Sequence, residues 1–400
     1  MTTSQSIILD CYPPKKMGQA NAIFGLCAVI GPTIGPTLGG YIIDNLAWNW
    51  IFFINVPFGV IATFLAWKHV PDMIGAVKPE KIDWLGIGLL ILFVGLLQYV
   101  LAEGDKKDWF ASLEIIVLLV FSLLSLAGFI WRELAINYAV INITLYKNYN
   151  IAMGSILMFV TGMILTGSVY IFPVFVQVSL GWTATMTGVF MIPGALAAAV
   201  GMVVVGKFSA GINPKILIVT GIMTTFLFLF IMSFSSPNSS AQDFFWAYIL
   251  RGFGMSLLMI PILTLSVSGL QGKLLAQAAG LTNMLRQLGG AVGVVFINIL
   301  VNNLNANARA GMIGNFTDYS SACMERISLF TQNFLAAGYP ADEAAKAAYK
   351  MTDVLLMRQQ QLLSYTHAFL GIGLGILACV PIVFLIKYRK IGIQGKGNIQ

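Results

Sequence analysis

The sequence predicts an all-α protein, a polytopic bundle of membrane-spanning helices, and its composition and spacing together predict this class. Apolar residues (AVILMFWYC) make up 58% of the 400 residues, whereas charged residues make up only 10%. A soluble protein of this length needs a far more polar surface. The apolar residues also gather in runs of about 20, which as α-helices cross the hydrocarbon core of a bilayer.

Ten stretches have the length and composition of a membrane span. In chain order they are 19–43, 50–69, 84–102, 112–131, 151–172, 184–206, 215–235, 244–266, 278–301 and 363–386. The basic residues between them are unequally distributed, with fourteen in one set of alternating loops and seven in the other. Because Lys and Arg accumulate on the cytoplasmic side, we expect the first set of loops and both termini of this chain to be cytoplasmic.

The first span contains an unusual run of glycine and proline, GPTIGPTLGG, over residues 31–40. Its glycines at i, i+4 and i+8 form a stripe without side chains, which lets a second membrane helix approach closely. Its prolines remove backbone donors and kink the helix, which a membrane helix tolerates when neighbouring groups satisfy the freed carbonyls. The residues of interest are Gly31, Pro32, Gly35, Pro36, Gly39 and Gly40.

This run resembles the antiporter motif in the fifth helix of drug:proton exporters of the major facilitator superfamily. Residues 50–59, WIFFINVPFG, are similar to the start of the sixth helix in the same family. Residues 83–86, DWLG, resemble the start of the extra helix pair in its 14-helix branch, the EmrB/QacA type. The resemblance covers nearly the whole chain and implies the major facilitator fold, with about 10 transmembrane helices present of an expected 14.

The same resemblance implies a function. It implies a secondary active exporter that exchanges protons for hydrophobic or amphipathic compounds by alternating access, with no cofactor and the proton gradient as energy source. It implies residence in the bacterial cytoplasmic (inner) membrane, and it allows a periplasmic adaptor protein and an outer-membrane channel as partners. An exporter of another substrate, such as a siderophore, lipid or metabolite, stays open as the alternative.

The expected organisation follows the two-half plan of that family. Residues 1–70 would supply the end of helix 4 and helices 5 and 6 of the N-terminal half, and residues 71–150 the linker with two extra helices. Residues 151–390 would form the C-terminal half, with a long extracytoplasmic loop at 302–361, and residues 391–400 a cytoplasmic tail. Four further helices would precede the motif helix in a 14-helix relative, and the acid that carries the proton is expected there.

An internal repeat supports two related halves without reference to any family. Residues 15–20, KKMGQA, align with residues 273–278, KLLAQA, at an offset of 258. At that offset Gly31 meets Gly289 and Gly35 meets Gly293. Transporters of this kind are built from such repeated bundles.

Charged groups inside spans are costly and often line a transport pathway. Arg251 and Arg286 are the two arginines within spans, and Asn283 and Gln287 flank the second. We expect them to line the central cavity, with snorkelling to the nearer interface as the alternative. In the span 151–172, Met158, Phe159 and Tyr170 would form an adaptable apolar wall, with plain packing as the alternative.

Other classes of function find little support in the sequence. Two histidines and sixteen acids show no clustered catalytic or metal-binding set, and no phosphate-binding GxxxxGK[ST] loop is present, so we expect neither an enzyme nor an ATP-driven pump. The four cysteines have no paired spacing. We expect residues 302–361 to form a partly ordered loop that is helical from about 341, with a docking surface as the alternative.

Overall fold

The computed structural model describes residues 31, 34–69, 83–136, 143–208, 212–267, 273–313 and 321–386. These residues are almost entirely helical and include no β-strand. Nine of the described helices are long and apolar enough to cross a membrane. The all-α prediction is therefore confirmed. Much of the first predicted span, 19–43, lies outside the described residues, and so does Pro32 of the motif.

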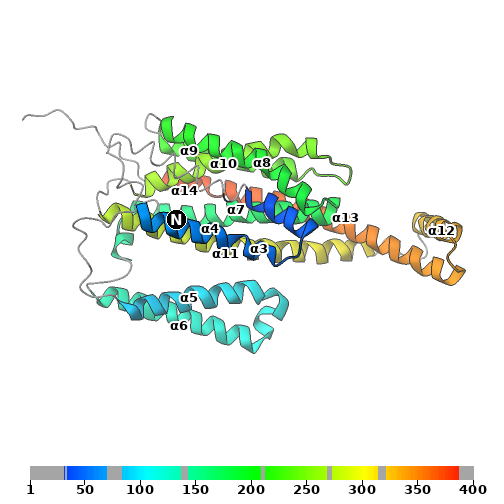
Figure 1. Ribbon diagram of the computed structural model, residues 1–400, viewed down its shortest axis with the longest axis horizontal. Helices are drawn as coiled ribbons and strands as arrows, with labels where there is room; N and C mark the ends of the chain where they lie inside the picture. The colour runs from blue at the N-terminus through cyan, green and yellow to red at the C-terminus, as the bar shows by residue number, and fades with distance from the viewer. Residues whose placement is uncertain are drawn as a thin grey trace, which may run out of the picture.

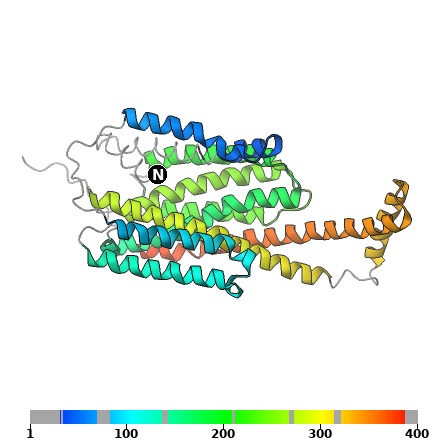
Figure 2. The same ribbon diagram turned by 60° about the horizontal axis from the view of Figure 1, so that its bottom comes forward.

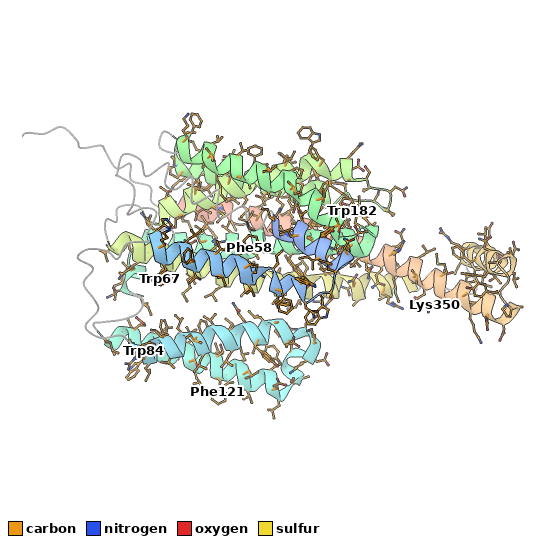
Figure 3. The ribbon with its side chains drawn as sticks, in the orientation of Figure 1. Phe58, Trp67, Trp84, Phe121, Trp182 and Lys350 are labelled. Atoms are coloured by element: carbon orange, nitrogen blue, oxygen red, sulfur yellow. The ribbon has the colours of Figure 1, made fainter. Side chains whose placement is uncertain are left out.

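The first part of the chain supplies three helical segments: residues 34–45, α3 (Trp50–Phe53) and α4 (Asn55–His69). They lie along one edge of the molecule, in blue in Figure 2. No residue of α4 is buried, and Phe58 and Trp67 are 66% and 85% exposed (Figure 3). An apolar helix with this exposure is suited to contact lipid or another helix rather than water.

The predicted linker helices form a hairpin that lies beside the main bundle (Figure 1) and contacts α11. It consists of α5 (Trp84–Glu103), two short 3₁₀ turns at Asp105–Lys107 and Trp109–Ala111, and α6 (Leu113–Ala135). The Ser122 hydroxyl donates a hydrogen bond to the Phe93 carbonyl, 3.0 Å away, and so joins the two helices in their buried seam. Trp84 and Phe121 point outward from the hairpin, at 73% and 57% exposure (Figure 3).

Asp83 fixes the start of this hairpin, which explains the DWLG sequence in physical terms. Its Oδ1 accepts a hydrogen bond from the Gly86 N–H at 3.0 Å and thereby caps α5. The same oxygen accepts a bond from Nε of Arg132 at 2.7 Å, so the end of α6 is tied to the start of α5. The Gly86 amide, and then Arg132, hold the pKa of Asp83 below its ordinary value.

The C-terminal part forms the main packed bundle. Its elements are η4 (Ile143–Lys147), α7 (Tyr149–Leu180), α8 (Ala184–Phe208), α9 (Pro214–Met232), α10 (Ala241–Ser266), α11 (Lys273–Ile313), α13 (Ala341–Leu377) and α14 (Val380–Leu385). The predicted spans are found here, although α7, α11 and α13 are much longer than expected. The last predicted span, 363–386, is divided because α13 ends at Leu377 and α14 begins at Val380.

A close helix contact in the bundle joins α7 and α11 through glycines. A Cβ added at Gly289 would lie 2.0 Å from the Phe159 carbonyl oxygen, and one at Gly293 would lie 2.1 Å from that of Met163. In return, a Cβ at Gly162 would lie 2.2 Å from the Arg286 carbonyl oxygen. Gly289 and Gly293 are the repeat equivalents of Gly31 and Gly35, so the second copy of the stripe does bring two helices together.

Residues 302–361 are not a partly ordered loop where the structure describes them, so that expectation was wrong. α11 continues to Ile313, α12 (Ser321–Ala336) folds back, and α13 begins at Ala341 as expected. Together they project from one end of the bundle (Figure 1). Arg309 pairs with Asp353 at 3.5 Å, and α12 packs on α13 through buried Ile327, Ala344 and Ala348. The residues of these polar segments are good helix formers. Because their polarity resembles that of a loop, the sequence did not indicate how much of the segment is helical.

The glycine contact predicts a sharp difference between two alanine substitutions. Gly289→Ala should cost about 1–3 kcal/mol, because the added methyl group meets backbone that cannot move aside. The matched control is Gly375→Ala in α13, where an added Cβ meets nothing within 4 Å. Thermal melting in detergent should show a clear loss for the first variant and little change for the second. Equal melting temperatures would contradict the role of the α7–α11 contact.

The Asp83 cap predicts a pH effect with a definite sign. Because the pKa of Asp83 is depressed in the folded protein, its stabilisation is complete above the ordinary aspartate pKa and is lost as pH falls below about 4. Asp83→Asn keeps a capping side chain but removes the charge, so its melting temperature should depend less on pH between 7 and 3. Melting curves of both proteins at the two pH values test this, and parallel pH dependence would count against it.

Candidate transport site

The motif helix of the first part meets the C-terminal bundle at the start of α8. A Cβ added at Gly40 would lie 2.3 Å from the Ala184 carbonyl oxygen, and one at Gly188 would lie 2.5 Å from that of Pro36. The Thr37 hydroxyl donates a hydrogen bond to the Gly188 carbonyl at 2.9 Å. The two backbones therefore touch, and only glycine fits at either position.

A carboxylate adds a polar contact at the same end. Oδ2 of Asp44 accepts hydrogen bonds from the Thr185 N–H at 2.7 Å and from the Thr185 hydroxyl at 2.6 Å. Thr185 lies in the first turn of α8, where backbone N–H groups lack partners within the helix. Sequence reasoning missed Asp44 because it follows the predicted span and matches no part of the motif.

The glycine stripe itself does not form this contact. In the described residues nothing lies within 4 Å of a Cβ added at Gly31, Gly35 or Gly39. The expectation that this stripe receives a second helix is therefore not met in the part of the chain that the structure describes. The close approach is made one residue later, at Gly40, because Gly40 faces α8 whereas Gly39 does not.

Aromatic side chains fill the bundle near the start of α8. Phe172 of α7 is fully buried, with its ring centroid 5.6 Å from that of Phe190 and 4.7 Å from that of Tyr248. Further pairs extend this network to α13 through Phe175, which contacts Tyr365 and Phe369. This end of the bundle is thus packed rather than hollow.

Arg251 borders that aromatic network. Arg251 is 8% exposed, and its guanidinium carbon lies 4.8 Å from the centroid of the Tyr248 ring. Its Nε is buried and has no hydrogen-bond partner among the described residues, and neither does the Tyr248 hydroxyl. The contact is therefore a cation–π contact in a poorly hydrated setting, where such contacts are strongest.

Arg286 lies in a different place from Arg251. It is on α11, half-buried, and its Nε is 3.4 Å from Oδ1 of Asn283, while Gln287 is exposed. The structure thus brings Arg286 and Asn283 together, as their helical spacing predicted. It places Arg251 apart from them, on α10 beside Tyr248.

The predicted apolar wall of α7 is only partly accessible. Met158 is 1% exposed and belongs to the bundle core, so its assignment to a cavity wall was wrong. Phe159 is half-buried and Tyr170 is 37% exposed. The sequence could not separate these positions because α7 is apolar around its whole circumference.

One groove was not anticipated by the sequence. It has a volume of about 400 Å³ and lies between α5 of the hairpin and α11. Beside it the Asn302 amide donates a hydrogen bond to Asp105 at 2.6 Å. None of the candidate residues from the sequence lines this groove. Its lining residues are Gln98, Leu101, Ala102, Asp105, Ala291, Val294, Val295 and Asn298.

The described residues hold no group of three or more His, Cys, Asp or Glu side chains placed to bind a metal ion. Of the cysteines, Cys379 is buried in the bundle and Cys323 is half-buried on α12, and neither is in a disulfide. What this architecture provides is a contact between two helical bodies at one end, with charged groups buried within one of them.

Such an arrangement defines a multi-pass helical membrane protein. Residues 1–294 match the model of the Major Facilitator Superfamily, which is more than half of the chain. The chain therefore belongs to that superfamily, and its relatives place it in the branch of drug:proton antiporters.

Three curated relatives illustrate this placement. Fatty acid resistance protein FarB of Neisseria gonorrhoeae is 29% identical over 385 residues, covering 96% of this chain and 74% of FarB. Multidrug export protein EmrB of Haemophilus influenzae is 34% identical over 304 residues, covering 76% of this chain and 60% of that protein. EmrB of Escherichia coli is 29% identical over 359 residues, covering 90% and 66%. The chain thus spans about two thirds of the length of these relatives.

A solved structure shows the same fold. It is a bacterial homologue of the human lysosomal transporter Spinster, in an inward-facing and occupied conformation. The match has a TM-score of 0.50 at 13% identity and covers 96% of this chain and 72% of the other.

The Arg251 contact predicts energetic coupling between two side chains. Arg251→Met and Tyr248→Leu should each destabilise the bundle, but the double variant should lose less than the sum, by about 1–2 kcal/mol. Tyr248→Phe is the matched control, since it keeps the ring and removes a hydroxyl without a partner. Melting of the four proteins in detergent measures the coupling, and strict additivity would argue against a cation–π contact.

Proposed function

We propose that the protein exports hydrophobic and amphipathic compounds in exchange for protons, by alternating access of its two halves. The observation that carries the proposal is the contact between the motif helix and the start of α8, which joins the two proposed halves. The multidrug export proteins among the relatives support the substrate class. The proton gradient would supply the energy, with no cofactor.

The proposed setting is the bacterial inner membrane with both termini of this chain in the cytoplasm. The distribution of basic residues supports this orientation, because Lys147, Lys207 and Lys215 lie at one end of the bundle and the projection at the other. The contact at Asp44 then lies at the outer, periplasmic end. The acid that carries the proton would be a residue other than the candidates named above.

The projection formed by α11, α12 and α13 is the proposed docking surface for a periplasmic adaptor, with an outer-membrane channel beyond it. It lies outside the bundle, and Lys350 marks its polar surface in Figure 3. Several apolar side chains on it are nevertheless exposed, which is a feature of protein-contact surfaces. They are Met324, Leu329 and Leu335 on α12 and Met351, Val354 and Met357 on α13.

The exporter proposal predicts proton-dependent efflux. Cells that carry the gene as it stands should expel preloaded ethidium faster than cells from which it is deleted, and a protonophore should abolish the difference. Gly188→Leu should abolish efflux too, because its side chain meets the Pro36 backbone, whereas Gly375→Leu in open space should preserve it. Fluorescence decay with matched membrane levels measures this.

Two results would contradict the proposal. One is efflux that persists after the proton gradient is collapsed, which would require another energy source. The other is an equal rate in cells with and without the gene, measured over several chemically different dyes.

A further inference from the structure

The contact between the motif helix and α8 lies at the start of α8. It involves residues 36–44 of the first helix and residues 184–188 of the second. Further along α8, Gly194 and Gly201 face Tyr248 and Ser256 of α10 instead. Gly31, Gly35 and Gly39 lie on another face of the motif helix and have open space around them in the described residues. Along α8, the described contact with the motif helix is therefore made at its first turns.

Within this contact, Asp44 differs from the glycines because it accepts hydrogen bonds, whereas the glycines only allow the backbones to approach. The start of α8 carries unpaired N–H groups and the positive end of the helix dipole, which both favour a carboxylate. One of these N–H groups is satisfied within the same half, because the Met186 N–H donates to the Thr183 hydroxyl at 3.1 Å. Another is satisfied by the opposite half, because the Thr185 N–H, like the Thr185 hydroxyl, donates to Asp44.

We propose that Asp44 is a positioning residue of the transport cycle: its carboxylate latches the outer end of the N-terminal half onto the start of α8, and this latch opens when the outer side opens. The proposal rests on the alternating-access function proposed above. Gly40 and Gly188 allow the approach, and Asp44 sets how firmly the closed arrangement is held.

The latch is an ionised group at neutral pH. The groups that face Asp44 are Thr183, Ala184 and Thr185 at the start of α8, and no charged side chain in the described chain contributes to its pKa. The hydrogen bonds from Thr185 hold the pKa of Asp44 below its ordinary value. The closed arrangement therefore keeps its full stabilisation above the ordinary pKa and loses it only as pH falls below about 4. Asp44 is a latch, and the transported proton binds elsewhere.

The test measures separation of the two helices directly. Thr37 is half-buried at the contact, so Thr37→Cys reports opening through its reaction with a membrane-impermeant maleimide added outside the cells. The reporter is placed in a protein whose four native cysteines are serines, with the efflux of each variant recorded in parallel. Asp44→Ala should raise the labelling rate roughly fivefold, the value of one charge–helix contact.

Two further variants make the result specific. Thr185→Val removes the hydroxyl donor but keeps the N–H donor, so it should raise labelling in the same direction by a smaller factor. Asp108→Asn is the matched control: it neutralises an exposed aspartate at the same end of the molecule, in a left-handed conformation that asparagine also adopts, and should leave labelling unchanged. The increase from Asp44→Ala should be the same at pH 7.5 and pH 5.5.

Labelling and efflux separate the two proposals. Unchanged labelling in both Asp44→Ala and Thr185→Val, with normal membrane levels, overturns the latch even where efflux is intact. An equal rise in the Asp108→Asn control also overturns it, since the effect would then be one of surface charge. Absent efflux in the unaltered protein overturns the exporter function, whereas the labelling ratio still reports whether Asp44 holds the helices together.

Discussion

Close backbone approach between helices is the constraint on which the rest of the structure depends. Lipid chains are as apolar as leucine side chains, so helices in a membrane gain little from burying apolar surface and must gain from contact distance and hydrogen bonds. Gly289 and Gly293 bring α11 against the backbone of α7 over two turns. That contact fixes both long helices, and they in turn carry Arg286, Asn283 and the base of the projection.

The glycine repeat occurs twice in the chain, and its two copies make different contacts. In the second copy of the repeat, α7 packs directly against Gly289 and Gly293, whereas Gly31 and Gly35 face open space in the described chain. The first part of the chain instead makes its close contact at Gly40, against the start of α8 near Gly188. The two copies of the repeat thus make different helix contacts from related sequences.

The sequence predicted the class and the spans that the structure describes, because hydrophobic length is a property of single segments. It located Arg286 beside Asn283 because their spacing is local to one helix. It did not locate Asp44 on Thr185, since that contact joins residues 141 apart and depends on how two helices cross. It misassigned Met158 because a helix that is apolar all round gives no sign of which face is buried, and it underestimated the projection because polarity alone does not distinguish a loop from a water-exposed helix.

The unbroken course of α13 has a mechanical consequence. Its 37 residues span about 55 Å, so the helix leaves the bundle core at Phe369 and reaches the far tip of the projection without a joint. Arg309 and Asp353 tie it to α11 on the way, which stiffens the pair. A tilt of about 10° at Phe369 would displace the tip, about 40 Å away, by roughly 7 Å, so the helix can act as a lever. Under the proposed alternating access, a partner bound at the tip would be moved with the C-terminal half, and a partner that held the tip still would restrain the bundle.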